Sequence, residues 1–238
     1  MSFKLDEYDS DIKKILKCTI FATYIKKLCL LQSGITYDMI ECSQFMWFSI
    51  KAFDKNAANA ILDSMPNVFE FCKQYNINLP TYRGYPHAIH FAILSDFAET
   101  WHPSMYKYFK IVPINKITPG CIISWAFNNY GIDSQQSDTG HTGCVTSYIS
   151  EDNRFYFSHS IPANKDPKNI GGPTQTIFSA KGNIIKSIIN EKMIGGALCF
   201  IGLAPCTDIV SFSPPSKISF NNVKNGRTLL TYINDAKI

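Results

Sequence analysis

The chain has 238 residues, of which 45% are hydrophobic and 18% are charged, a composition that excludes a disordered or fibrous protein and allows one sizeable core. Its net charge of +4 comes from 23 basic and 19 acidic residues that are interleaved without a dense basic block, so no nucleic-acid partner is expected. The N-terminal 31 residues combine acidic residues with lysines that interrupt the apolar positions, which is atypical of a signal peptide. No apolar run has the length of a membrane span.

The first half of the sequence predicts helices. Apolar residues recur at helical spacing over residues 10–31, which indicates an amphipathic helix packed on a core; a helix on a membrane surface is the weaker interpretation, because its lysines form no broad cationic face. The run from Cys42 to Phe53 is apolar on every side and predicts a central, buried helix. Further helices are expected at about 57–64, at 66–75 with Pro66 in the first turn, and at 88–100.

After residue 120 the pattern changes to short strand-like runs separated by turn residues. The expected strands are "CIISWAF", "TGCVTSYI", "RFYFSHS", "TQTIFSA", "NIIKSII" and "ALCFIGL". Helices followed by strands predict an α+β domain in which a central helix packs on a mainly antiparallel sheet. We expect one domain over residues 1–206 with a helical insertion at about 54–112, followed by a C-terminal extension at 207–238.

Three residues form a candidate catalytic set. Cys42 begins the central helix, where the helix dipole lowers the pKa of a thiol and favours the thiolate. His141 opens a strand between two glycines and is the candidate base, and His159 on the next strand is placed to hydrogen-bond the far nitrogen of His141. Singly, a cysteine or histidine in such a place is more often structural; the ordered combination favours a cysteine nucleophile.

The same segments resemble the NlpC-type cell-wall peptidases and amidases, which have a reduced papain-like fold. "ECSQFMW" is similar to the nucleophile motif of that family, "GHTGCV" to its histidine strand, "PGCIISW" to the preceding strand, and "FSHS" to the strand that carries the third residue. The resemblance covers about residues 37–203, with a long unmatched stretch at 54–112. It implies Cys42 as nucleophile, His141 as base and His159 as orienting residue.

The chain departs from the family pattern at three positions near the predicted site. Glu41 stands where the family has aspartate, Gln44 where it has glycine, and Cys121 where it has the aspartate of the strand opening. None of these changes removes a catalytic atom, and Gln44 is the one expected to narrow or alter the cleft.

The resemblance implies a cysteine hydrolase that cleaves an amide bond in a cell-wall-like peptide, through an acyl-thioester and without a metal or cofactor. The expected partner is a peptide or muropeptide-like substrate, or a protein of a host or rival cell, reached from the cytoplasm or through a leaderless secretion route. Deamidation or acyl transfer by the same thioester is an alternative. A silent peptide-binding module with the same fold is the alternative from a different class.

Other residues that often carry chemistry have weaker patterns here. His87 and His90 have a spacing that suits a metal on a helix, but no third ligand is evident, so a structural or exposed role is expected. Eight cysteines without a CxxC pair predict neither a zinc site nor a disulfide scaffold, and Cys121 and Cys144 are expected as small core residues, facing each other on adjacent strands, unless oxidation is shown. Asp138 is expected to favour a turn, and the three tryptophans to lie in the core, with Trp101 or Trp125 as an alternative lining for a peptide cleft.

Overall fold

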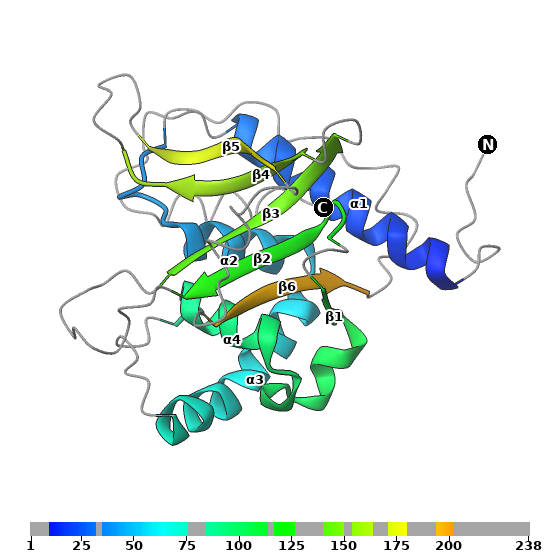
Figure 1. Cartoon of the computed structure of the whole chain (residues 1–238), viewed down its shortest axis with the longest axis vertical. Helices are drawn as coiled ribbons and strands as arrows, with labels where there is room; N and C mark the ends of the chain where they lie inside the picture. The colour runs from blue at the N-terminus through cyan, green and yellow to red at the C-terminus, as the bar shows by residue number, and fades with distance from the viewer. Residues whose placement is uncertain are drawn as a thin grey trace.

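The computed structural model describes residues 10–31, 35–75, 84–113, 117–126, 140–149, 154–163, 171–179 and 194–201. These residues form an α+β arrangement of helices on an antiparallel sheet, as the sequence predicted (Figure 1). The α-helices are α1 (Ser10–Leu31), α2 (Cys42–Phe53), α3 (Lys55–Gln74) and α4 (Ala88–Asp96). The strands are β1 (Phe109–Val112), β2 (Cys121–Ala126), β3 (Gly140–Ile149), β4 (Arg154–Ile161), β5 (Gly172–Ser179) and β6 (Gly195–Phe200).

The strands form one sheet in the order β1-β6-β2-β3-β4-β5, and every neighbouring pair is antiparallel. Strands β3, β4 and β5 follow one another along the chain as a meander, whereas β6 inserts between β1 and β2. Strand β1 belongs to the stretch that the sequence marked as a helical insertion, and its pairing with β6 makes this stretch part of the domain. The predicted strand at 183–189, Asp138 and the extension at 207–238 lie outside the described residues.

Helices α1 and α2 agree with the predicted ranges, but the next two predictions need correction. One helix, α3, replaces the two that were expected, and Pro66 lies inside it rather than in a first turn. The loss of one backbone hydrogen bond at the proline is outweighed by a continuous buried face, which extends from Ala57 through Ile61 to Val68. The expected helix at 88–100 is interrupted at Phe97, and a 3₁₀ turn follows over Ala98–Thr100.

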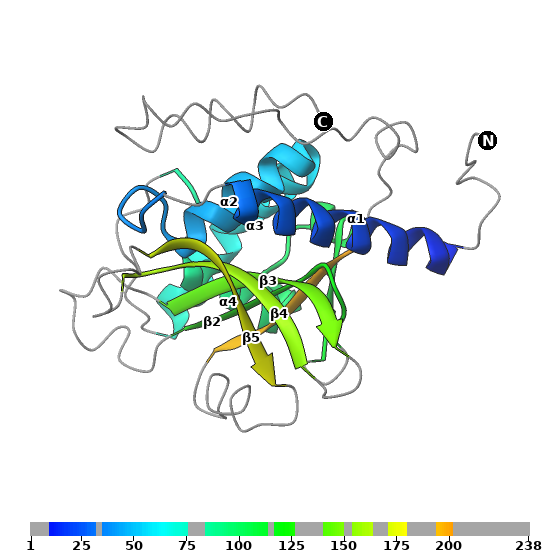
Figure 2. The ribbon, with the colours of Figure 1, turned by 90° about the horizontal axis from the view of Figure 1, so that it is seen from above.

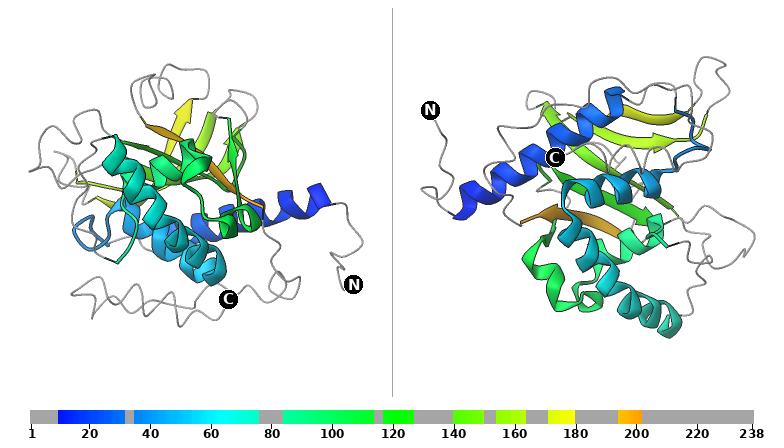
Figure 3. Two further views of the ribbon diagram at one scale, coloured as in Figure 1. Left: turned by 90° about the horizontal axis from the view of Figure 1, so that it is seen from below. Right: turned by 180° about the vertical axis from the view of Figure 1, so that it is seen from behind.

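The helices α1, α2 and α4 lie on one face of the sheet (Figure 2; Figure 3, right). The ring of Phe200 on β6 lies 4.7 Å from that of Phe21 on α1 and 5.4 Å from that of Phe53 on α2, measured between centroids. Gly196 lies so close to α4 that an added Cβ would be 2.3 Å from the Ser95 carbonyl oxygen. The helix-covered face is therefore the one to which Gly196 and Phe200 belong.

A disulfide joins Cys121 on β2 to Cys199 on β6, which corrects the expectation that Cys121 is a reduced core residue. The two residues are directly opposite each other in the antiparallel register. Their Cα atoms are 4.4 Å apart, the separation typical of a non-hydrogen-bonded pair in an antiparallel sheet. Cys144 pairs instead with Ile122, so its side chain lies on the other face from Cys121. The expected Cys121 to Cys144 contact is therefore wrong, because the register of β2 against β3 places Ile122, and not Cys121, opposite Cys144.

Among the described residues, no helix combines the length and the apolar character that a membrane span needs.

Candidate active site

His141 and His159 lie side by side on neighbouring strands, β3 and β4. The Nε2 atom of His141 and the Nδ1 atom of His159 are 2.6 Å apart, and the two rings are nearly perpendicular, at 79°. The hydrogen bond that the sequence predicted between these two imidazoles is therefore present. The other nitrogen of His141, Nδ1, is therefore the one that can accept a proton from a nucleophile.

Gly143 makes the contact between the two histidines possible. It lies directly opposite His159 in the register of β3 and β4. A Cβ atom at this position would be 2.8 Å from the Cβ of His159 and 2.6 Å from Cζ of Phe157, distances that real Cβ atoms essentially never show. The second glycine of "GHTGCV" therefore has a steric role beneath the imidazole pair.

A third polar group continues the line of hydrogen bonds. The Nε2 atom of His159 lies 2.8 Å from the hydroxyl oxygen of Thr176 on β5. Both ring nitrogens of His159 thus have partners, His141 on one side and Thr176 on the other. The sequence prediction missed Thr176, because the register of β5 against β4 places it and no local pattern marks it.

Aromatic side chains surround the imidazole pair. The ring centroid of Trp125 is 5.0 Å from that of His141, and the centroid of Phe157 is 5.0 Å from that of His159. Phe178 on β5 adds a further edge contact to His159, at 6.1 Å. Trp125 is 8% exposed, which agrees with the core position that the sequence predicted for it.

The apolar surroundings keep both histidines neutral. Burial lowers the pKa of His141 from its usual 6.5 to about 4. Burial and the charge that His141 would carry lower the pKa of His159 to about 3. At neutral pH each ring therefore carries one proton, and His141 is available to accept another.

Cys42 is the first residue of α2, as predicted, and its side chain is 3% exposed. The amide of the preceding Glu41 donates to the Gln44 Oε1 atom at 3.1 Å, so Gln44 forms half of a capping box. Gln44 therefore has a structural reason to be present at the start of this helix.

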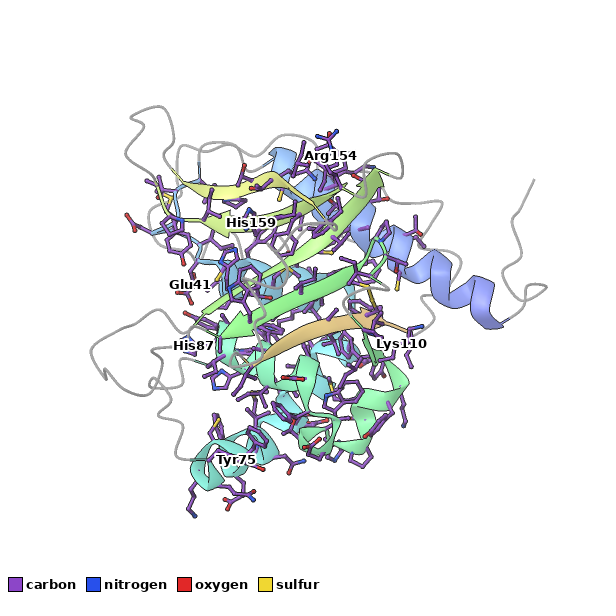
Figure 4. The ribbon with its side chains drawn as sticks, viewed as in Figure 1. Glu41, Tyr75, His87, Lys110, Arg154 and His159 are labelled. Atoms are coloured by element: carbon purple, nitrogen blue, oxygen red, sulfur yellow. A yellow bond between two sulfur atoms is a disulfide. The ribbon has the colours of Figure 1, made fainter. Side chains whose placement is uncertain are left out.

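The Glu41 carboxylate links the start of α2 to the segment before α4. One of its oxygens accepts the hydroxyls of Ser43, at 2.8 Å, and Tyr85, at 3.2 Å. The Tyr85 ring lies 5.3 Å from that of His87, and Figure 4 shows Glu41 and His87 at the same end of the sheet. The starts of two helices thus meet next to Cys42.

His87 and His90 have a structural role at the start of α4. The backbone N–H of His87 donates to Nδ1 of His90 at 2.8 Å, which caps the helix, and His90 is fully buried. Burial, together with the charge that His87 would carry when protonated, lowers the pKa of His90 to about 3. In the part of the chain that the structure describes, no group of three or more potential ligands is arranged to hold a metal ion.

Cys42 lies at the same end of the sheet as the histidine pair. The hydroxyl of Ser160, the neighbour of His159, donates to the carbonyl of Ile40, two residues before Cys42, at 2.6 Å. The two candidate groups belong to different faces, however. His141 pairs with Trp125, whereas the adjacent Thr142 bonds Ser124 on the face that α4 covers, so the imidazole side is the face opposite the helices.

The structure thus brings His141 and His159 together and adds Thr176 to them, while Cys42 belongs to the helical layer on the other side of the sheet. Comparisons with protein-family models, curated proteins and solved structures returned no match.

Proposed function

We propose that the chain is a cysteine hydrolase of amide bonds with a papain-like fold of the NlpC type. Cys42 is the nucleophile, His141 the base and His159 the group that orients His141. The observation that carries the proposal is the 2.6 Å hydrogen bond between the two imidazoles, because it holds one nitrogen of His141 and leaves the other to act as a base.

The reaction proceeds through an acyl-thioester. His141 Nδ1 takes the proton of the Cys42 thiol, and the thiolate attacks the carbonyl carbon to form a C–S bond. The proton then passes to the amide nitrogen as the C–N bond breaks, and the amine leaves. Water attacks the thioester with His141 as base, which releases the acid and restores the thiol. The Cys42 backbone N–H, at the start of α2, is a donor for the oxyanion.

The electrostatics of the histidine pair leave His141 in the neutral form that a base needs. With a pKa lowered to about 4, it is unprotonated at Nδ1 or Nε2 at physiological pH, although it is a weaker base than an exposed imidazole. Catalysis requires the Cys42 sulfur and His141 Nδ1 to meet around the start of β3, at the edge of the sheet where Ser160 joins the end of β4 to the segment before α2.

The resemblance of the motifs supplies the substrate class. It implies a peptide in which a D-glutamyl residue is joined to a diamino acid, and a protein of a host or rival cell as an alternative substrate. Deamidation and acyl transfer use the same thioester and differ only in the leaving group and the acceptor.

A second candidate function is a peptide-binding module without turnover. One observation favours it, namely that the helical layer with Cys42 and the face with His141 lie on opposite sides of the sheet.

One experiment separates the two candidates. The tripeptide L-Ala-γ-D-Glu-meso-diaminopimelate is incubated with the full chain, with Cys42→Ala and with Cys72→Ala, which removes a buried helical thiol away from the site. A hydrolase gives free diaminopimelate and an acyl-enzyme by intact mass with the native chain and Cys72→Ala. Cys42→Ala, which has no sulfur to acylate, forms no acyl-enzyme and releases about 10³-fold less diaminopimelate. Calorimetric binding that Cys42→Ala retains, without product from any variant, supports the binding module instead.

A further inference from the structure

We propose that Thr176 is a positioning residue that sets the tautomers of both imidazoles, so that Nδ1 of His141 carries a lone pair rather than a proton. The inference deepens the proposed function and rests on it for its catalytic consequence, whereas the tautomers themselves are measurable without any substrate.

The three groups form one line of hydrogen bonds with two links. His141 Nε2 lies 2.6 Å from His159 Nδ1, and His159 Nε2 lies 2.8 Å from the Thr176 hydroxyl. A neutral imidazole has one N–H and one lone pair, so each ring that donates on one side accepts on the other. The protons in the line must therefore all point the same way.

The direction of the line decides what His141 can do. If Thr176 accepts from Nε2–H of His159, then His159 Nδ1 accepts from Nε2–H of His141, and Nδ1 of His141 is a base. If Thr176 donates, each bond reverses and Nδ1 of His141 carries the proton. Only the first direction is compatible with abstraction of a proton from a thiol.

The intrinsic preference of the imidazole ring favours the accepting role of Thr176. The accepting direction puts both rings in the Nε2–H form, which is the more stable tautomer of a neutral histidine side chain, and the reverse direction puts both in the less stable form. His159 is 4% exposed and bordered by the rings of Phe157 and Phe178, so its Nε2 atom depends on the partner that β5 provides.

The register supplies a matched control for Thr176. On β5, Thr174 lies directly opposite His159, and Thr176 lies opposite Phe157, two residues further along the same face. The two threonines are both half-buried on one strand, but it is the diagonal one that lies 2.8 Å from the imidazole. Replacement by valine keeps the shape of either side chain and removes only the hydroxyl.

The test is ¹⁵N NMR of the imidazole nitrogens in the full chain at pH 7, in which two-bond couplings distinguish protonated from unprotonated nitrogens. His141→Gln assigns the signals of that ring. We expect an unprotonated Nδ1 of His141 in the native chain, in Thr176→Ser and in Thr174→Val, and a protonated Nδ1 in Thr176→Val, where His159 retains only its bond to His141. A protonated Nδ1 in the native chain, or no change in Thr176→Val, overturns the inference.

The kinetic readout connects the tautomer to catalysis. We expect Thr176→Val to lower kcat by about 10- to 100-fold, as for other groups that orient a histidine, with KM unchanged and with activity retained in Thr176→Ser and Thr174→Val. A tautomer change in a chain that hydrolyses no amide refutes the proposed function and leaves the inference intact. Hydrolysis that depends on Cys42, together with tautomers that do not change in Thr176→Val, supports the proposed function and refutes the inference about Thr176.

Discussion

Gly143 is the residue on which the geometry of the histidine pair depends most directly. The space for a side chain at this position is taken by His159 and Phe157. Gly143→Ala should therefore separate the strands or displace the imidazole. We expect a loss of about 1–3 kcal/mol in the free energy of unfolding, which is typical of overpacking, and a changed His159 imidazole signal by NMR. An unfolding free energy and an NMR signal equal to those of the native chain would show that the site does not have this close approach.

The sequence predicted the two histidines and their contact, because one histidine is flanked by glycines and the other ends a strand, and both features are visible in the local sequence. No local feature of the sequence marked Thr176 or the hydrogen bond from Tyr85 to Glu41. Their contacts arise from register and from helix packing, which relate residues 17 and 44 positions apart. The sequence therefore predicted the two histidines but not the side chains that hydrogen-bond or pack around the candidate site.

At the scale of an element, Gln44 stabilises the start of α2 by accepting the Glu41 amide proton. Gln44→Ala removes that acceptor and should lower the free energy of unfolding by about 1 kcal/mol, measured by urea denaturation. The matched control is Gln74→Ala at the exposed end of α3, which should change it by less than about 0.5 kcal/mol. Equal effects of the two substitutions would contradict the capping role.

The disulfide between β2 and β6 joins residues that are 78 positions apart in the sequence. Cys121→Ala together with Cys199→Ala should lower the free energy of unfolding by about 2–4 kcal/mol, since the cross-link restricts the unfolded chain. Denaturation in the presence and absence of a reductant gives the same comparison in the native chain. Peptide mapping without reductant that finds Cys121 alkylated would contradict the pairing.

Element bounds agreed with their predictions where an apolar run is uninterrupted, and differed at a proline and at a very short strand. The bounds of α2 followed from an apolar run that begins at Cys42. Pro66 indicated a helix start, but the apolar face of α3 continues through it, and burial outweighed the local preference of the proline. Strand β1 is only four residues long and gains its identity from pairing with β6, so its sequence carried little signal.

At the level of the whole molecule, three histidines whose pKa is lowered by burial make stability depend on pH. The pKa is lowered to about 4 for His141 and to about 3 for His90 and His159, whereas in the unfolded chain each is near 6.5. Below pH 6.5 the unfolded state therefore binds more protons than the folded state. The contribution of the neutral histidines to the free energy of unfolding is fully present above that pH. It falls on acidification, by up to about 1.4 kcal/mol per pH unit for each histidine.

Urea denaturation between pH 5 and 7 measures this dependence, in a range where most carboxylates in both states are already ionised. His90→Gln should reduce the slope by about one third, because it removes one of three equivalent protonations. A stability that is constant over this range, or that rises on acidification, would contradict the buried, neutral state of these rings.

The arrangement of layers was the part of the molecule that the sequence predicted least. Helix and strand periods predicted an α+β domain, and the structure has one. Which face of the sheet carries the helices depends on packing at contacts such as Gly196 against α4, which no local pattern specifies. The relation between Cys42 and the histidine pair depends on this choice of face.

The central claim is that Cys42 and His141 act as a pair, and alkylation of Cys42 by iodoacetamide as a function of pH tests it most directly. Site-resolved mass spectrometry follows the rate in the native chain and in His141→Ala. Cys29 and Cys72 serve as internal references, because burial raises the pKa of each thiol to about 12. We predict that Cys42 reacts rapidly well below pH 8.5, the value of an ordinary thiol, and slows in His141→Ala, while the references stay unmodified. A Cys42 that is inert, or that reacts identically in both chains, would contradict the claim.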